Sequence, residues 1–453
     1  MLRSFRLANH RSFRGEAELS LLPAYDKGRP AVPVAAIYGA NAAGKSNLVD
    51  GLMFMRSAVR DSYRAWDPAG SIPRRPFRLD PAGGSQPSLF TVDLLLAGAR
   101  YTYGFVVDDE VVREEWLYTY PKSRRRILFE REGTSIRLGE SLGPARSKGE
   151  ALAELTRPNA LFLSLAAQVG LAEVGAVSEW FTRGGLVKAG DTINRDRRNL
   201  AAFMTGPFRG RLKELLATAD TGINDVGVDT EELPRELAGK VESAEAALRV
   251  QLDTLAESAR RAQLDTLAEQ DIAMQARRML GRGEFLLTEM ETAREKYGTR
   301  PAIRFRHGPD VYLDLEDESA GTRAWIHALA DTLTVLDGGG VLVVDEIDSS
   351  LHPNLTALLI QQFRSGETNP HGAQLIFTTH DATLLGTSFG EEVLARDEIW
   401  FVEKNAGGGS RLYPLTDFHP RTGENRERRY LGGSYGAVPV LGELGPAAPD
   451  HVA

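Results

Sequence analysis

The sequence contains no cysteine among its 453 residues. This absence excludes disulfide bonds, thiolate zinc sites and thiol catalysis, and it favours a reducing, cytoplasmic setting. Long apolar runs are missing too, since no stretch approaches the roughly 20 residues that cross a bilayer. Positive charge is not in excess either, because the net charge is −8. That balance argues against a protein that coats nucleic acid, although it leaves room for a local basic groove.

Apolar residues (42%) and charged residues (26%) are present in the proportions of a globular protein with two or three domains. Residues 1–190 begin with an antiparallel hairpin at 3–22 and a buried strand at 31–38, followed by a helix and a β-rich lobe. Residues 301–453 return to strand–helix alternation, which predicts a parallel sheet. The predicted elements are strands at 89–96, 100–107, 114–120, 303–306, 311–315, 341–344 and 374–378, and helices at 324–336 and 354–363.

Between these parts, residues 191–300 are rich in helix formers. An apolar stripe from Leu237 to Ala262 is typical of one face of a helix, and it indicates a helical arm or hairpin. An ordinary helical lobe packed on the core is the alternative. The expected fold class is therefore α/β: two halves of one core with a mixed sheet and a β-rich lobe, interrupted by a helical insertion.

The strongest motif is Gly39-Ala-Asn-Ala-Ala-Gly-Lys-Ser46, which fits G-x-x-x-x-G-K-[ST]. Because it lies between an apolar strand and an amphipathic helix, it predicts a loop whose backbone N–H groups surround phosphates. Lys45 would reach the β- and γ-phosphates, and the Ser46 hydroxyl would bind Mg²⁺. The predicted ATP-binding residues are Gly39, Asn41, Ala42, Ala43, Gly44, Lys45 and Ser46.

Two later strands end in residues suited to catalysis. Asp345 and Glu346 follow the apolar run 341–344, so Asp345 would hold Mg²⁺ directly or through water and Glu346 would act as general base. His380 ends the strand at 374–378 and could contact the γ-phosphate or the attacking water. The alternatives are a helix-start acid for Glu346 and a structural role for His380.

In this order the motifs resemble those of the ABC-like ATPases, which include SMC and RecF-type repair proteins and OLD-type phage-defence ATPases. Residues 345–353 resemble their Walker B motif and D-loop. Residues 318–323 resemble their signature motif, although they depart from the transporter form Leu-Ser-Gly-Gly-Gln. The resemblance implies that Ser319, Gly321 and Thr322 contact the γ-phosphate held by another subunit, and hence a homodimer, or a higher even-numbered oligomer, around two nucleotides.

Further predictions concern single residues and segments outside these motifs. Gln168 ends a β-lobe segment (159–168) at the family's position for the Q-loop glutamine, which would bind Mg²⁺; a solvent-facing glutamine is the alternative. Arg11 lies in an opening hairpin that resembles the one near the nucleotide in these ATPases, so the resemblance implies that Arg11 also binds ATP. The tail at 399–439 resembles the C-terminal end of abortive-infection ATPases of the AbiL and RloA type. Basic clusters at 124–126 and 195–198 could contact nucleic acid, or they are solvated faces.

Together the resemblance implies a slow, Mg²⁺-dependent ATPase that is the sensor or switch of an anti-phage defence system. OLD-type relatives carry a Toprim nuclease after the ATPase core, but only about 50 residues follow Glu403. The effector is therefore expected on another chain, which in relatives is a Toprim or RloB-like protein. The alternatives are an SMC- or RecF-like DNA repair ATPase, a transporter's nucleotide-binding subunit, and an ATP-bound scaffold that does not hydrolyse.

Overall fold

The computed structural model divides the chain into two compact units, Met1–Thr192 with Ala320–Ala453, and Ile193–Ser319. The first unit therefore contains most of each half predicted to build one core. The division falls at residues 193 and 320, so strands expected in the C-terminal half belong to the second unit. The structure describes residues 1–80, 83–190, 197–232, 243, 246–254, 299–309, 311–349, 351–387, 389–421 and 423–439.

A mixed sheet in the first unit joins strands from both halves of the chain. Its order is β16-β15-β3-β14-β13-β9. The strands β9, β13, β14, β3 and β15 are parallel to their neighbours, and β16 is antiparallel to β15. The bounds are β3 Val34–Tyr38, β9 Leu186–Lys188, β13 Val341–Val344, β14 Gln374–Thr379, β15 Ile399–Lys404 and β16 Ser410–Pro414.

A second, antiparallel sheet forms the β-rich lobe, in the order β2-β1-β4-β5-β6-β7-β8. It contains the predicted opening hairpin and all three predicted β-type runs, which are confirmed. Strands β7 and β8 extend the sheet beyond the prediction. The bounds are β1 Leu2–Ala8, β2 Ala17–Ser20, β4 Ser88–Leu96, β5 Ala99–Val107, β6 Val112–Thr119, β7 Arg126–Glu132 and β8 Ser135–Leu138.

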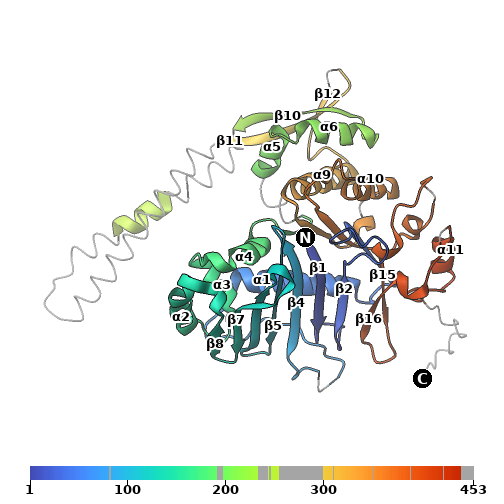
Figure 1. The fold of residues 1–453 in the computed structure, drawn as a ribbon. Coiled ribbons are helices and arrows are strands. Elements are labelled where there is room, and N and C mark those ends of the chain that lie inside the picture. The colour runs from blue at the N-terminus through green and yellow to red at the C-terminus, as the bar shows by residue number, and fades with distance from the viewer. Residues whose placement is uncertain are drawn as a thin grey trace, which may run out of the picture. The chain divides into compact units, whose positions relative to one another are not determined.

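Helix α1 (Lys45–Asp61) connects the two sheets through one core. Its apolar face, which includes Leu48, Leu52 and Met55, belongs to the same buried cluster as side chains of both sheets. Helix α1 also contacts α3 (Phe162–Gln168) and α4 (Gly175–Thr182), beside α2 (Arg146–Leu155) (Figure 1). The remaining helices of this unit are α9 (Ala320–Gly338), α10 (Pro353–Arg364) and α11 (Arg426–Leu431).

The second unit is not purely helical. Its described residues include helices α5 (Arg197–Thr205) and α6 (Arg209–Thr218), and an antiparallel sheet in the order β10-β11-β12. The strands are β10 (Ile223–Glu232), β11 (Thr299–His307) and β12 (Val311–Asp314). The prediction of helix across this part of the insertion is wrong at 223–232, which form a strand. Most of the apolar stripe predicted from Leu237 to Ala262 lies outside the described residues.

Candidate functional site

The phosphate loop connects β3 to α1. All five residues of β3 are buried, and α1 begins at Lys45. The preceding residue, Gly44, has φ of 118°, a conformation that side chains disfavour. Gly39 has no room for a side chain either, since a Cβ would lie 2.3 Å from the carbonyl oxygen of Val402. The two glycines of the motif are thus required by backbone geometry.

Lys45 lies across the inside of this loop. Its Nζ donates to the carbonyl oxygens of Gly39 (2.7 Å) and Ala40 (3.3 Å), and it lies 3.2 Å from Nε2 of His380. Burial lowers the pKa of Lys45, and the nearby carboxylates, of which Glu346 has the largest effect, oppose that shift. An anion in the loop would offer the ammonium a stronger partner than these carbonyl groups.

Parallel strand pairing brings the acidic residues to the loop. Strand β13 pairs with β14, and β14 pairs with β3, so the carboxyl ends of all three meet at one edge of the sheet. The Ser46 hydroxyl donates to Oδ1 of Asp345 at 3.1 Å. Two residues predicted to hold Mg²⁺ from opposite halves of the chain are therefore in contact.

A hollow of about 280 Å³ opens at this edge. It contains the predicted loop residues after Gly39 and both predicted catalytic residues: Asn41, Ala42, Ala43, Gly44, Lys45, Ser46, Asn47, Glu346, His380 and Lys404 line it. Glu346 has a left-handed backbone with φ of 52°. The backbone N–H of His380 points at the Asp348 carboxylate, with N···O distances of 3.2 and 3.3 Å. Backbone geometry thus fixes both predicted catalytic residues at the hollow.

Arg11 lies beside the hollow in the turn after β1, where its φ is 50°. Its guanidinium donates to both oxygens of Asp50, at 2.5 and 2.8 Å, and Nε2 of His10 lies 2.9 Å from the same carboxylate. Burial raises the pKa of Asp50, but hydrogen bonds from His10 and Arg11 outweigh it and leave that pKa below its usual value. The pairing with Asp50 was not predicted from the sequence, because the two residues meet only in the fold.

A second hollow, of about 470 Å³, adjoins the first and shares Asn47 and Lys404 with it. Cationic side chains dominate it, together with two apolar ones. The lining residues are Arg11, Ser12, Asn47, Arg75, Pro76, Arg78, Leu79, Lys404 and Gly408. In the described part of the chain, neither Arg78 nor Lys404 has a carboxylate within ion-pair distance. This hollow can therefore receive an anionic or electron-rich group next to the phosphate loop.

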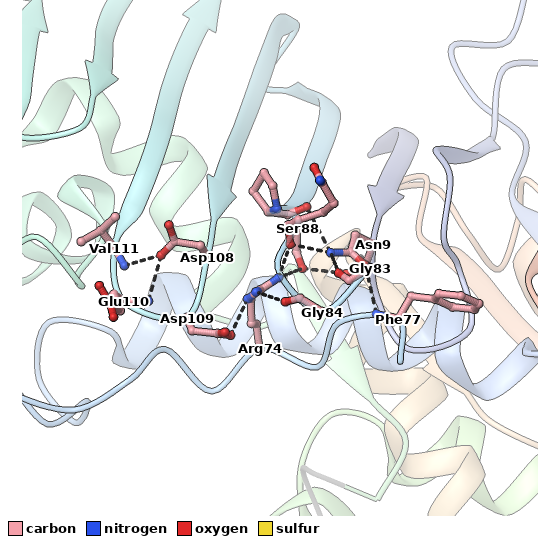
Figure 2. Close-up of polar contacts among 12 residues, drawn as sticks. Asn9, Arg74, Phe77, Gly83, Gly84, Ser88, Asp108, Asp109, Glu110 and Val111 are labelled. Atoms are coloured by element: carbon pink, nitrogen blue, oxygen red, sulfur yellow. Dashed lines mark hydrogen bonds and ion pairs between the residues drawn. The ribbon is translucent and has the colours of Figure 1, made fainter. Parts of the chain in front are cut away.

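Buried polar contacts hold the segment that supplies Arg75, Arg78 and Leu79 (Figure 2). Arg74 is almost completely buried and donates to Asp109 (2.8 Å), to Ser88 (3.2 Å) and to backbone carbonyl groups. Asn9 accepts a hydrogen bond from the backbone N–H of Phe77 (3.0 Å) and donates to the Gly83 carbonyl (2.9 Å). The sequence predicts only a loop here, because these partners are distant in the chain.

The turn between β15 and β16 contacts the phosphate loop from behind. The hydroxyl of Ser410 donates to the carbonyl oxygen of Ala43 at 2.5 Å and lies 2.7 Å from Oγ of Ser12. Asn47 donates to the same Ser12 hydroxyl at 2.7 Å. The run Gly407–Gly409 is the sequence signal for this tight turn, although its position beside the loop is a tertiary feature.

The signature-like segment begins helix α9. Ser319 is the last residue of the second unit, and Gly321 and Thr322 lie in the first turn of α9, which starts at Ala320. Backbone N–H groups at a helix start form an anion site. None of these three residues lines either hollow of the first unit.

Gln168 is not brought to the hollow. It ends α3, and Ser164 of that helix accepts a hydrogen bond from the backbone N–H of Tyr63, just beyond the C-terminal end of α1. Ser46 lies at the other end of α1, about 25 Å away at about 1.5 Å per residue. The structure therefore corrects the assignment of Gln168 as a Mg²⁺ ligand at the phosphate loop.

The basic clusters predicted as nucleic-acid contacts remain untested. Arg125 lies over the ring of Tyr118 at 4.7 Å, and the cluster at 195–198 lies largely outside the described residues.

Over the described residues, no group of three or more His, Asp or Glu side chains is arranged to hold a metal ion. No helix among them is long and apolar enough to cross a membrane.

Solved structures that are similar to this chain include SMC heads. They include the SMC head domain from Thermotoga maritima (13% identity, 91% of this chain and 98% of that chain, TM-score 0.40). An Smc head domain with a coiled coil and joint derived from Pyrococcus yayanosii is similar over 96% of this chain and 99% of that chain (12% identity, TM-score 0.37). No curated protein matches the chain.

One protein family matches the sequence over two long stretches. Residues 34–165 and 182–386 match the family described as "AAA domain, putative AbiEii toxin, Type IV TA system". The matched residues include the phosphate loop, Asp345, Glu346 and His380. Because the match covers well over half of the chain, the protein belongs to this family of AAA domains.

Proposed function

We propose that the chain binds ATP with Mg²⁺ at the first hollow and hydrolyses it. The observation that carries this proposal is the contact between Ser46, in the phosphate loop, and Asp345, at the end of β13. These residues are separated by most of the chain, and their types are those that hold the nucleotide-bound metal in P-loop proteins. Membership in an AAA domain family supports the same activity.

The donor set at this edge fits Mg²⁺. The ion takes oxygen ligands and usually keeps several waters, binding through one or two protein groups plus phosphates. The Ser46 hydroxyl and the Asp345 carboxylate are such groups, and they lie 3.1 Å apart. Mg²⁺ held there would neutralise charge on the β- and γ-phosphate oxygens.

The rest of ATP fits the adjoining hollow. With its phosphates in the loop, the nucleoside would extend past Asn47 and Lys404, which belong to both hollows. Pro76 and Leu79 supply apolar contact for a base, and Arg78 supplies a guanidinium that can lie over an aromatic ring. The two hollows would then hold the whole nucleotide between them.

Glu346 is the general base of the proposed reaction. Its left-handed backbone lies at the end of β13, at the hollow that contains Lys45. The carboxylate would accept a proton from the attacking water, while Lys45 and the loop N–H groups stabilise charge on the phosphates. His380 lies beside Lys45 and would contact the γ-phosphate or that water.

We further propose that ATP turnover makes the chain the switch of an anti-phage defence system, with the effector on a separate chain. The family description names a putative AbiEii toxin of a type IV TA system, and this supports a role in defence. The resemblance of residues 318–323 to the ABC-like signature supports a dimer around two nucleotides. A nuclease-like partner encoded next to this chain would supply the effector chemistry.

Lys45→Ala tests the nucleotide site. Loss of a charge-assisted contact to two phosphates should weaken ATP binding about 100-fold. The measurement is ATP affinity by calorimetry, together with steady-state hydrolysis. Lys148→Ala is the matched control, because Lys148 donates only to the backbone of residues 169 and 170. ATP binding that survives Lys45→Ala would remove the phosphate-loop assignment.

Phage challenge tests the switch. Phage should form fewer plaques on cells that express the wild-type chain with its neighbouring reading frame than on cells that express the Glu346→Gln or Lys45→Ala variant. Suppose that the wild-type protein hydrolyses ATP in vitro and that plaque numbers are equal for the wild type and both variants. This result would count against the defence role but not against the proposed ATPase activity. A defect in DNA repair in those variants would favour the repair alternative.

A further inference from the structure

Thr378 lies between the two acidic residues of the proposed site. It belongs to β14 and is fully buried. Its hydroxyl donates to Oδ1 of Asp345 at 2.7 Å and accepts the backbone N–H of Glu346, also at 2.7 Å. One hydroxyl group is therefore bonded to consecutive residues of the neighbouring strand end.

The first of these bonds fixes the Asp345 carboxylate. Oδ1 accepts hydrogen bonds from Thr378 and from Ser46, so this oxygen faces the sheet and the phosphate loop. A carboxylate bound by two donors has one preferred rotamer. Without the Thr378 hydroxyl, Ser46 alone would orient the side chain.

The second bond supports an unfavourable backbone. Glu346 has φ of 52°, which is uncommon for residues other than glycine and is retained only where surrounding contacts enforce it. The N–H of Glu346 would otherwise be left without its partner in a part-buried position. The direction of the Glu346 side chain follows from this turn, so the Thr378 hydroxyl also affects the general base.

We infer that Thr378 is a positioning residue for ATP hydrolysis: its hydroxyl aligns Asp345 for the metal and holds Glu346 in the left-handed turn. The inference rests on the proposed function. Thr378 would act through these two acids and would not itself touch the nucleotide, since it does not line the hollow. Its removal should therefore slow the chemical step more than it weakens nucleotide binding.

The next residue supplies a matched control. Thr379 is also fully buried in β14, but its hydroxyl only accepts the backbone N–H of Asp381 at 3.0 Å. Side chains alternate between the two faces of a strand, so Thr379 points away from the acids that Thr378 contacts. Thr379→Val makes the same chemical change in the same strand without touching Asp345 or Glu346.

The experiment measures kcat, KM for ATP and the Mg²⁺ concentration for half-maximal rate. For Thr378→Val we expect kcat to fall about tenfold or more, because misplacement by about 1 Å can cost roughly 100-fold. The Mg²⁺ requirement should rise, and ATP affinity without Mg²⁺ should stay unchanged. Thr378→Ser, which keeps the hydroxyl, should restore the rate, and Thr379→Val should behave as wild type.

A double substitution distinguishes an effect on the positions of the two acids from a general loss of structure. In a Glu346→Gln background, Thr378→Val should slow hydrolysis little further, because residues that act as a unit are not additive. Thermal unfolding of each variant checks folding, and Thr378→Ala replaces Thr378→Val if the valine variant does not fold. A wild-type rate and Mg²⁺ requirement in the folded hydroxyl-free variant would overturn the inference alone. Absence of ATP binding by the wild type would overturn the proposed function and this inference with it.

Discussion

At the scale of single residues, one buried carboxyl group lies directly before a strand of the mixed sheet. Glu398, directly before β15, is almost completely buried. Burial raises its pKa from 4.5 to about 7, although Arg364 and the backbone N–H of Ala395 oppose that shift. The folded protein thus binds this proton more tightly than the unfolded chain does.

This carboxyl predicts a dependence of stability on pH. Because its folded pKa is the higher one, its stabilising effect is complete below pH 4.5 and is lost as pH rises toward 7. Glu398→Gln cannot ionise, so the variant should gain about 3 kcal/mol relative to wild type between pH 4.5 and 8. Urea unfolding at both pH values measures this gain. The exposed Glu367 serves as control, and an equal gain in Glu367→Gln would contradict the explanation.

Residues of the site differ in how far the sequence could predict them. The phosphate loop, Asp345 and Glu346 were predictable because each is a short contiguous motif at the end of an apolar strand. Gln168 was misplaced because its assignment depended on a single glutamine, with no strand end or glycine pattern to locate it. Thr378 could not be assigned a role, since its partners belong to a neighbouring strand and only the register of β13 against β14 brings them together.

At the scale of elements, the phosphate loop depends on a turn from the far end of the chain. Ser410, at the start of β16, donates to the Ala43 carbonyl, and its backbone N–H donates to the Ser12 carbonyl at 2.7 Å. A Cβ at Gly44 would lie 2.2 Å from the Ser410 hydroxyl oxygen, so loop and turn are in close contact. The turn therefore restrains the loop before any phosphate arrives.

Ser410→Ala should loosen this restraint. Loss of one buried hydrogen bond costs about 1 kcal/mol, which corresponds to roughly fivefold weaker ATP binding if the loop must be reordered on binding. Titration with ATP and thermal unfolding measure the two effects. Ser57→Ala is the control, because Ser57 donates only to the Phe54 carbonyl within α1. Unchanged ATP affinity in folded Ser410→Ala would show that the turn does not preorganise the loop.

Some elements with clear apolar patterns were predicted well, but the apolar segment 159–168, interpreted as the end of a β-lobe segment, contains helix α3. Strand β13 and helix α9 were predicted from their apolar residues. Strand β10 was missed because it contains Asn, Gly and several acidic residues, which are depleted in strands. It pairs with β11, on the other side of residues 233–298, so tertiary contacts override local propensity.

At the scale of the whole molecule, the unit that contains the phosphate loop is built from two separate stretches of the chain. The phosphate loop lies in Met1–Thr192 and the acidic residues lie in Ala320–Ala453, yet both belong to one compact unit. The insertion between them ends at Ser319, within the signature-like segment that continues into helix α9. The signature-like segment therefore spans the boundary along the chain between the two units.

The proposed dimer places Lys45 of one copy and Ser319 of the other at each ATP. Lys45→Ala and Ser319→Ala should then be inactive separately, because each homodimer has two defective sites. In a mixed dimer, one site contains the intact Lys45 and the intact Ser319 together, while the other carries both substitutions. Since random pairing makes half of all dimers mixed, an equimolar mixture should recover about a quarter of the wild-type ATPase rate.

The steady-state ATPase rate of the mixture, measured against each variant alone, checks this expectation. Recovery requires exchange of subunits, so the two proteins are mixed before ATP is added and their association is followed by light scattering. A mixture of Lys45→Ala with Glu346→Gln is the control: both residues line the same hollow of one chain, so no arrangement of two copies restores a complete site. Recovery in this control, or none in the Ser319 mixture despite subunit exchange, would contradict a site shared between two copies.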